Sequence, residues 1–114
     1  MEITLEIASS LNTAEQLFWA NYNLANVFSE RGKFEDAQTH LERAKSHAVN
    51  SPYLLAYAMD QQARVWGGQR MFEEARSEAL HALNLFEKLG AVHDIKAARQ
   101  LLQNIDARRA RHPG

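Results

Sequence analysis

Histidine is the side chain in this sequence best suited to bind a metal ion or to transfer a proton near neutral pH. Of the five histidines, His40 and His47 are seven residues apart, which would place them on one helix face but about 10 Å apart along its axis. One ion cannot span that distance without further ligands, and the sequence has neither a His-Glu-x-x-His pattern nor a cysteine. We therefore expect no metal and no other cofactor, and we interpret the histidines as solvent-exposed.

Two pairs of adjacent carboxylates, Glu35–Asp36 and Glu73–Glu74, are the other groups suited to acid–base chemistry. Each pair comes at the start of a predicted helix, where negative charge interacts favourably with the helix dipole. The sequence also lacks a glycine-rich phosphate loop and a nucleophile elbow. These patterns favour a structural role for the carboxylates and predict that the protein is not an enzyme.

The overall charge of the chain gives no indication of a highly charged partner such as nucleic acid. The formal net charge is −1, with acids and bases interspersed, which argues against nucleic acid and anionic membranes as partners. The longest apolar stretches are far shorter than a transmembrane helix, and the N-terminus lacks the basic-then-apolar order of a secretory signal. The basic run Arg108, Arg109 and Arg111 is expected to complement the end of a helix dipole. We therefore expect a cytoplasmic protein.

The prolines and glycines fall almost entirely where helices would end, and this predicts an all-α chain. Thr13 and Gln16 fit a capping box at the start of the first helix, and Gly32 fits the left-handed position that closes it. Ser51 and Pro52 suit the N-cap and the first turn of the third helix. The predicted helices cover residues 13–31, 34–49, 52–68, 72–89 and 92–109.

Residues 1–12 allow two interpretations. Ile3, Ile7 and Leu11 fall on one stripe of a helix, whereas Ile3, Leu5 and Ile7 alternate as in a strand. We prefer the helix, which would be the second helix of an incomplete preceding repeat. The strand remains the alternative.

The predicted helices fall into two repeats. The segment Phe34-Glu35-Asp36-Ala37 recurs from position 72 as Phe-Glu-Glu-Ala, an offset of 38 residues. The same offset pairs further apolar positions, with the steps of three and four that mark one helix face. We therefore divide a single domain, residues 1–114, into a half-repeat (1–12), two repeats (13–50 and 51–90) and a terminal helix (91–110).

The repeated positions resemble the tetratricopeptide repeat family. Leu24-Ala25 is similar to the leucine-then-small pair of the family's opening helix, Phe28 to the aromatic residue one turn later, and Gly32 to the turn glycine. The other matching positions are Phe34, Ala37, Leu41, Ala44, Ala63, Trp66, Phe72, Ala75, Ala79 and Ala82. The resemblance implies an antiparallel helix-pair solenoid wound into a right-handed superhelix. An ordinary helical bundle with alanine-rich seams is the alternative.

The sequence departs from the family pattern in repeat length and at several positions. A period of 38 residues exceeds the usual one of about 34, and is similar to the longer repeats of kinesin light chains and signalling NTPases. Gln62 replaces an expected leucine, and Arg70 occupies the turn-glycine position of the second repeat. Asn21 and Met59 stand where the family often has tryptophan.

In this family the first helix of each pair lines a concave groove that binds a peptide or a partner helix. The resemblance therefore implies a protein–protein interaction module. The groove positions that would bind a partner are Trp19, Tyr22, Asn26, Tyr57, Asp60 and Arg64, and the positions beside them are Ser29, Glu30, Gly67 and Gly68. In the alternative interpretation, the aromatic residues only pack between helices.

The last predicted helix suggests a second hypothesis, in which the chain is a structural, self-associating segment of a larger signalling or scaffold protein. As a continuation of the groove it would contribute Ile95, Ala98, Leu102, Ile105 and Asp106. With nothing packed beyond it, Ile95, Leu102 and Ile105 would be exposed, whereas a solenoid normally ends in a polar capping helix. This pattern predicts a homo-oligomer.

Overall fold

The protein is all-helical in a computed structural model, which describes the backbone of residues 2–111 and the side chains of residues 13–111. The five helices are α1 (Glu2–Glu30), α2 (Phe34–Ser46), α3 (Pro52–Gly68), α4 (Phe72–Leu89) and α5 (Val92–Arg111). Within that described backbone there is no strand, so the predicted all-α class is confirmed.

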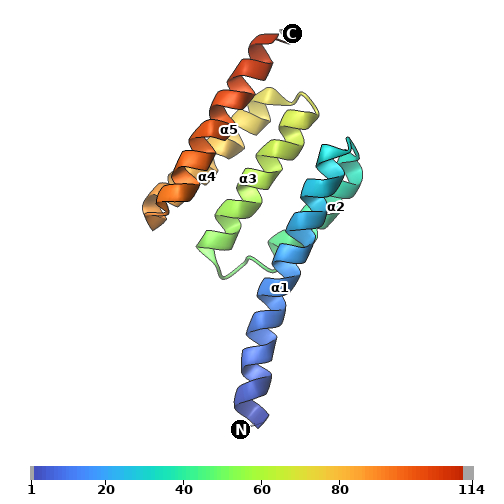
Figure 1. Ribbon diagram of the computed structural model, residues 1–114, viewed down its shortest axis with the longest axis vertical. Coiled ribbons are helices and arrows are strands. Elements are labelled where there is room, and N and C mark those ends of the chain that lie inside the picture. Colours follow the sequence, from blue (N-terminus) through green and yellow to red (C-terminus); the bar gives the residue numbers. More distant parts are fainter. Residues whose placement is uncertain (1, 112–114) are drawn as a thin grey trace.

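Consecutive helices run antiparallel, and α3 lies at the centre of the molecule (Figure 1). It contacts α1 and α2 on one side and α4 and α5 on the other. Across the described residues, α1 and α5 make no contact with each other, because α3 separates them. This arrangement leaves a face of α3 between α1 and α5.

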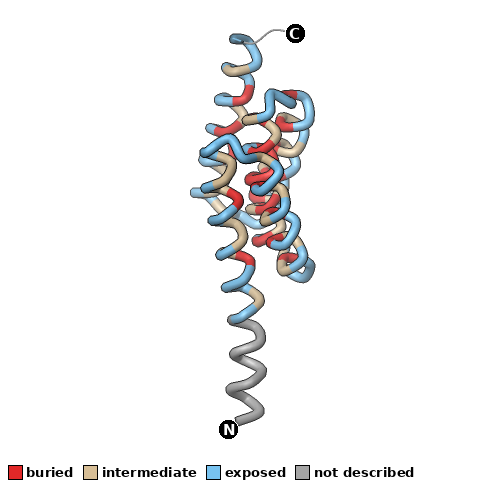
Figure 2. Tube along the Cα trace, turned by 90° about the vertical axis from the view of Figure 1, so that its right-hand side faces the viewer, coloured by how far each residue is buried: buried red, intermediate tan, exposed pale blue. Residues whose placement is uncertain are grey.

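Alanines occupy most of the helix–helix contacts, and the buried residues lie on helix faces turned toward neighbouring helices (Figure 2). Phe18, Leu41 and Val65 are fully buried between α1, α2 and α3, together with several alanines. Phe72, Leu101 and Ile105 pack with alanines of α3 and α4. Small side chains allow the helix backbones to approach closely, while the aromatic rings fill the wider gaps.

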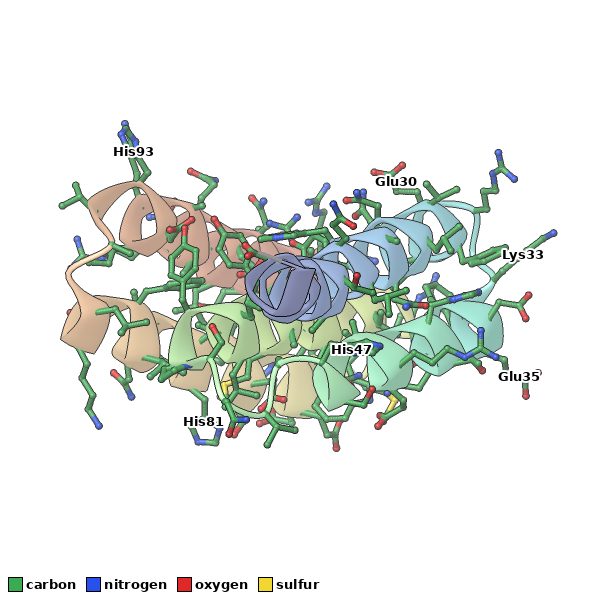
Figure 3. All side chains as sticks on the ribbon, turned by 90° about the horizontal axis from the view of Figure 1, so that it is seen from below. Glu30, Lys33, Glu35, His47, His81 and His93 are labelled. Atoms are coloured by element: carbon green, nitrogen blue, oxygen red, sulfur yellow. The ribbon has the colours of Figure 1, made fainter. Side chains whose placement is uncertain are left out.

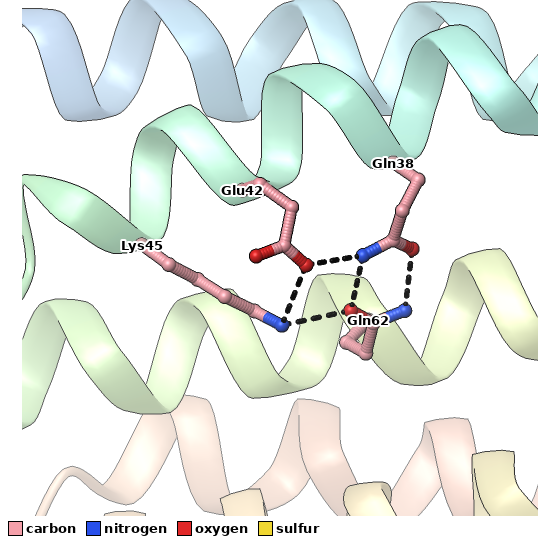
Figure 4. Close-up of polar contacts among 4 residues, drawn as sticks. All are labelled: Gln38, Glu42, Lys45 and Gln62. Carbon is pink, nitrogen blue, oxygen red and sulfur yellow. Dashed lines mark hydrogen bonds and ion pairs between the residues drawn. The ribbon is translucent and has the colours of Figure 1, made fainter.

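A polar network also joins α2 to α3 (Figure 4). The Gln62 side chain is only 1% exposed, and its amide pairs with that of Gln38 through two hydrogen bonds of 2.8 and 2.9 Å. The Lys45 ammonium donates a third bond, of 2.8 Å, to Gln62 Oε1, and Gln38 also donates to Glu42. Because both polar groups of the Gln62 amide are paired, glutamine is accommodated where leucine is expected.

The N-terminal helix differs from the prediction. Helix α1 passes through Thr13 without a break, so the predicted capping box at Thr13 and Gln16 is wrong. Thr13 lies inside the helix and is exposed. Residues 2–12 are helical, as preferred, and the strand alternative is wrong, but they continue directly into α1 and do not form a separate second helix of a preceding repeat. The side chains of Ile3 and its neighbours in 1–12 lie outside the described residues.

The remaining helix ends follow local chemistry closely. Ser51 caps α3 as predicted, because its Oγ accepts a 3.2 Å hydrogen bond from the Leu54 N–H, with Pro52 in the first turn. Helix α2 ends at Ser46, three residues before the predicted end, because the His47 N–H turns to the Ala44 carbonyl three residues back. Helix α5 continues two residues beyond its predicted end, to Arg111.

The turns that close α1 and α3 have the same geometry at the 38-residue offset. The Lys33 N–H bonds the Phe28 carbonyl at 2.8 Å, and the Met71 N–H bonds the Trp66 carbonyl at 2.9 Å. Each turn places one residue in the left-handed region: Gly32 at φ +75° in the first and Arg70 at φ +64° in the second. Glycine adopts that conformation without a steric penalty, whereas arginine does not.

Replacing Arg70 with glycine should therefore raise the free energy of unfolding by about 0.5 kcal/mol. Left-handed backbone costs a side-chain-bearing residue about 1–2 kcal/mol, and the greater chain entropy of unfolded glycine takes back about 0.5–1 kcal/mol. Urea denaturation of the two proteins measures the difference. Arg70→Ala is the control, because alanine removes the charge and keeps the strain; equal stabilisation by alanine and glycine would contradict the prediction.

Candidate binding groove

A groove of about 560 Å³ lies over α3 between α1 and α5. Ala63, Gly67 and Gly68 of α3 form its floor. Viewed along the helices, α1 and α5 lie on one side of the molecule, where Glu30 and His93 project, whereas His81 projects from the opposite side (Figure 3). The wall residues are Asn26, Ser29 and Glu30 of α1, and Leu101, Asn104, Ile105, Arg108 and Arg111 of α5.

The two floor glycines have different surroundings. A Cβ atom on Gly68 would lie 2.5 Å from the Phe34 ring, so the packing of that ring requires glycine. A Cβ atom on Gly67 would lie 3.9 Å from both Arg108 Nη1 and Ile105 Cγ1, which is ordinary van der Waals contact. Gly67 therefore tolerates a methyl group, but it is buried and its Cβ would also lie 4.0 Å from Ala75 Cβ of α4, so a longer side chain there would disturb the packing of α4 and α5.

The predicted aromatic contact residues form a cluster beside the groove, not its lining. Trp19, Tyr22 and Tyr57 contact one another edge-to-face, with ring centroids 5.1 to 6.0 Å apart. They are half-buried and pack against the core formed by α1, α2 and α3. Among the described residues, none of the three lines the groove. These three aromatic residues therefore pack between helices, which was the alternative interpretation of the sequence.

Asp94 of α5 joins this cluster, although the sequence did not single it out. The Tyr53 hydroxyl donates a 2.9 Å hydrogen bond to Asp94 Oδ2, and the Tyr57 hydroxyl donates to Asp94 Oδ1. Its place in the first turn of α5 pointed only to the helix dipole. These bonds fix the start of α5 against α3, and so they hold one wall of the groove in place.

Asp60 and Arg64 act as a pair. Arg64 Nε donates a 3.0 Å hydrogen bond to Asp60 Oδ2, and Asp60 is only 6% exposed. Burial raises the pKa of the Asp60 carboxyl, and the Arg64 guanidinium opposes that rise. Asp60 is therefore too buried to meet a partner directly, whereas the Arg64 side chain is 44% exposed and lines the groove.

Asn26 lines the groove as expected and contacts both the next turn of α1 and the neighbouring helix α3. Its amide nitrogen lies 3.4 Å from Glu30 Oε1, and its oxygen accepts from Gln61 Nε2 at 3.5 Å. Both contacts are long, so the Asn26 amide is weakly held. Gln61 is fully buried, and its Oε1 has no hydrogen-bond partner among the described residues.

The terminal helix is covered rather than exposed, which corrects the expectation. Ile105 is only 3% exposed, and Leu101 is 7% exposed, because α5 packs on both α3 and α4. Ile95 and Leu102 are half-buried at the edges of the same contacts. Asp106 turns away to pair with an arginine of α4 instead of facing the groove.

The histidines also depart in part from the expectation. His40 stacks on Phe28 at a centroid distance of 5.4 Å, and its Nδ1 lies 3.1 Å from Asn21 Oδ1, so this residue is half-buried. The prediction that it is solvent-exposed is therefore wrong, while His81 is exposed. In the described part of the chain, no cluster of histidine and carboxylate side chains could hold a metal ion.

The half-buried tyrosines make stability sensitive to alkaline pH. Burial, and next the Asp60 carboxylate, raise the pKa of Tyr22 to about 12, and burial and the bond to Asp94 also raise the pKa of Tyr57. Above pH 10 the unfolded chain loses tyrosine protons that the folded protein keeps. The free energy of unfolding should therefore fall with pH, by about 1.4 kcal/mol per unit for Tyr22 alone.

Tyrosinate absorbance, measured together with urea unfolding across this range, tests the prediction. Tyr22→Phe should remove the part of the tyrosinate absorbance that appears at the highest pH. It should also make the free energy of unfolding fall less steeply with pH. A stability that stays constant up to pH 12 would contradict it.

No protein-family model, no curated protein and no solved structure matches this chain. In the described part of the chain, none of the helices is long and apolar enough to cross a membrane.

Proposed function

We propose that this protein is a cytoplasmic protein-interaction module, without catalytic activity, that binds a peptide or partner helix in the groove between α1 and α5. The proposal keeps the resemblance to tetratricopeptide repeats and the right-handed superhelix that it implies. The observation that carries it is the groove itself, because α1 and α5 flank a floor of small α3 residues. A concave site with apolar floor and polar rim suits an elongated ligand.

The groove contains both kinds of contact that a peptide needs. The half-buried Phe34 ring contributes apolar surface to its lining. The weakly held amide of Asn26 can pair with a peptide backbone, and the Arg64 guanidinium can donate to a carboxylate or a carbonyl. Trp19, Tyr22 and Tyr57 then support the groove by fixing α1 against α3, instead of contacting the partner.

The test is to block the groove without disturbing the fold. Peptides selected from a random library on the wild-type protein should bind Asn104→Trp at least about tenfold more weakly, because Asn104 is exposed and lines the groove, so an indole there would occupy it. Asn104→Ala is the matched control: it should keep binding and should not lose stability, since the position is exposed and alanine favours the helix. Peptides that bind all three proteins equally would refute the groove as the site.

A self-associating structural segment is the second candidate, and one observation favours it. Helix α1 exposes Leu17, Leu24 and Val27, which are 42%, 42% and 39% accessible, at the spacing of one helix side. This stripe, and not the buried Ile105, is the apolar surface that a second copy would cover. A homo-oligomer formed through α1 would leave the groove free.

A further inference from the structure

We propose that the groove takes an acidic peptide segment, whose carboxylates lie beside Arg108 and Arg111. This inference rests on the proposed function and adds the chemical class of the partner. Three arginines line the groove: Arg64 is paired with Asp60, whereas Arg108 and Arg111 face one carboxylate among the described lining residues, Glu30. The excess is local, because the chain as a whole carries a net charge of −1.

In the last turns of α5, the excess of positive charge lies on the side of the helix that faces the groove. Toward α4, Asp106 pairs with Arg76 at 3.1 Å, and Arg109 pairs with Glu73. Toward the groove, Arg108 and Arg111 have no carboxylate partner in the described part of the chain. The charges of α5 are therefore balanced on one side and left unbalanced on the side that faces the groove.

The guanidinium of Arg108 is held in position over the floor. Its carbon lies 5.9 Å from the centre of the Phe72 ring, in a cation–π contact. Its Nη1 lies next to Gly67, one helical turn from Arg64 along α3. Arg111 stands about one turn further along α5. A ligand with successive negative groups along the groove would meet these cations in turn.

A peptide fits these features better than a nucleic acid does. The half-buried Phe34 ring offers apolar surface beside the arginines, which suits an acidic segment that also carries aliphatic side chains. Glu30 on the opposite wall would repel a phosphate backbone but can accept a peptide N–H. An apolar and acidic peptide is therefore the ligand that both walls can accommodate.

The experiment uses peptides selected from the random library on the wild-type protein, and fluorescence anisotropy of their labelled synthetic copies. Selected sequences should be enriched in aspartate and glutamate. Arg108→Gln combined with Arg111→Gln should weaken binding by about tenfold or more, as should replacing the peptide's acids with their amides. Arg109→Gln is the matched control, because that arginine faces α4, and it should leave the Kd within about twofold. Arg64 is left unchanged because it supports Asp60.

Three results would overturn the inference. If peptides lose binding on Asn104→Trp but carry no excess of acids and do not respond to the double arginine change, the groove binds peptides and the acidic class is wrong. If no selected peptide responds to Asn104→Trp, the proposed function fails as well. If a single-stranded oligouridine displaces the peptide and itself needs Arg108 and Arg111, the cations serve a nucleic acid.

Discussion

Replacing Ile105 with aspartate should detach α5 and lower the free energy of unfolding by at least about 4 kcal/mol. Ile105 is 3% exposed and packs with Phe72, Leu101 and alanines of α3 and α4. Removing the buried aliphatic side chain alone costs about 2–5 kcal/mol, and a carboxylate at the same place adds a desolvation cost that Arg108, one helical turn away, offsets only in part. Had Ile105 been the exposed residue that the sequence suggested, the same change would alter only assembly.

Far-ultraviolet circular dichroism during thermal unfolding distinguishes these outcomes. Val92→Asp is the matched control, since Val92 is 75% exposed on the same helix, and an acid at the helix start interacts favourably with its dipole. The control should unfold like the wild type. If the Ile105→Asp protein kept its stability and changed only its oligomeric state in solution, that result would contradict the packing of α5 described here.

Replacing Gln62 with alanine should lower the free energy of unfolding by about 2–3 kcal/mol. The change removes three hydrogen bonds from a side chain that is 1% exposed, and it leaves the Gln38 amide facing a gap between α2 and α3. The half-buried Gln38 amide keeps its bond to Glu42 but its oxygen loses its partner, so the cost comes from the lost bonds and from the space left beside α2. Gln62 thus stabilises the contact between α2 and α3.

Urea denaturation of a double-mutant cycle with Gln38→Ala measures the coupling, which should be about 1–2 kcal/mol. Gln103→Ala, on the exposed side of α5, controls for the loss of a glutamine from a helix and should change stability by less than about 0.5 kcal/mol. Additive effects of the Gln62 and Gln38 changes would show that the paired amides contribute nothing to stability.

Much of the fold was predictable because helix ends depend on local chemistry. Ser51 caps α3 and Gly32 closes α1 as predicted, since a hydroxyl acceptor and a left-handed glycine act within a few residues. Periodicity also marked the apolar side of α5. It could not show that α3 and α4 cover that side, because burial depends on contacts between distant segments; the exposure predicted for Ile105 was therefore wrong.

The groove was predictable only in part for the same reason. Asn26 and Arg64 line it at the positions that the family resemblance implied. Helical register also placed Tyr57 on that side of α3, but register does not tell whether a ring meets solvent or another ring. Arg108 and Arg109 are neighbours in sequence, and only the packing of α5 directs one to the groove and the other to Glu73.

Amide chemical-shift mapping with a selected peptide tests the central claim most directly. Peptide binding should shift the backbone signals of Asn26, Arg64, Gly67 and Asn104, which line the groove on three different helices. Signals from Thr39 and Asn84, on exposed positions of α2 and α4, should stay unchanged. Shifts confined to α2 and α4, or to the exposed stripe of α1, would contradict the groove as the binding site.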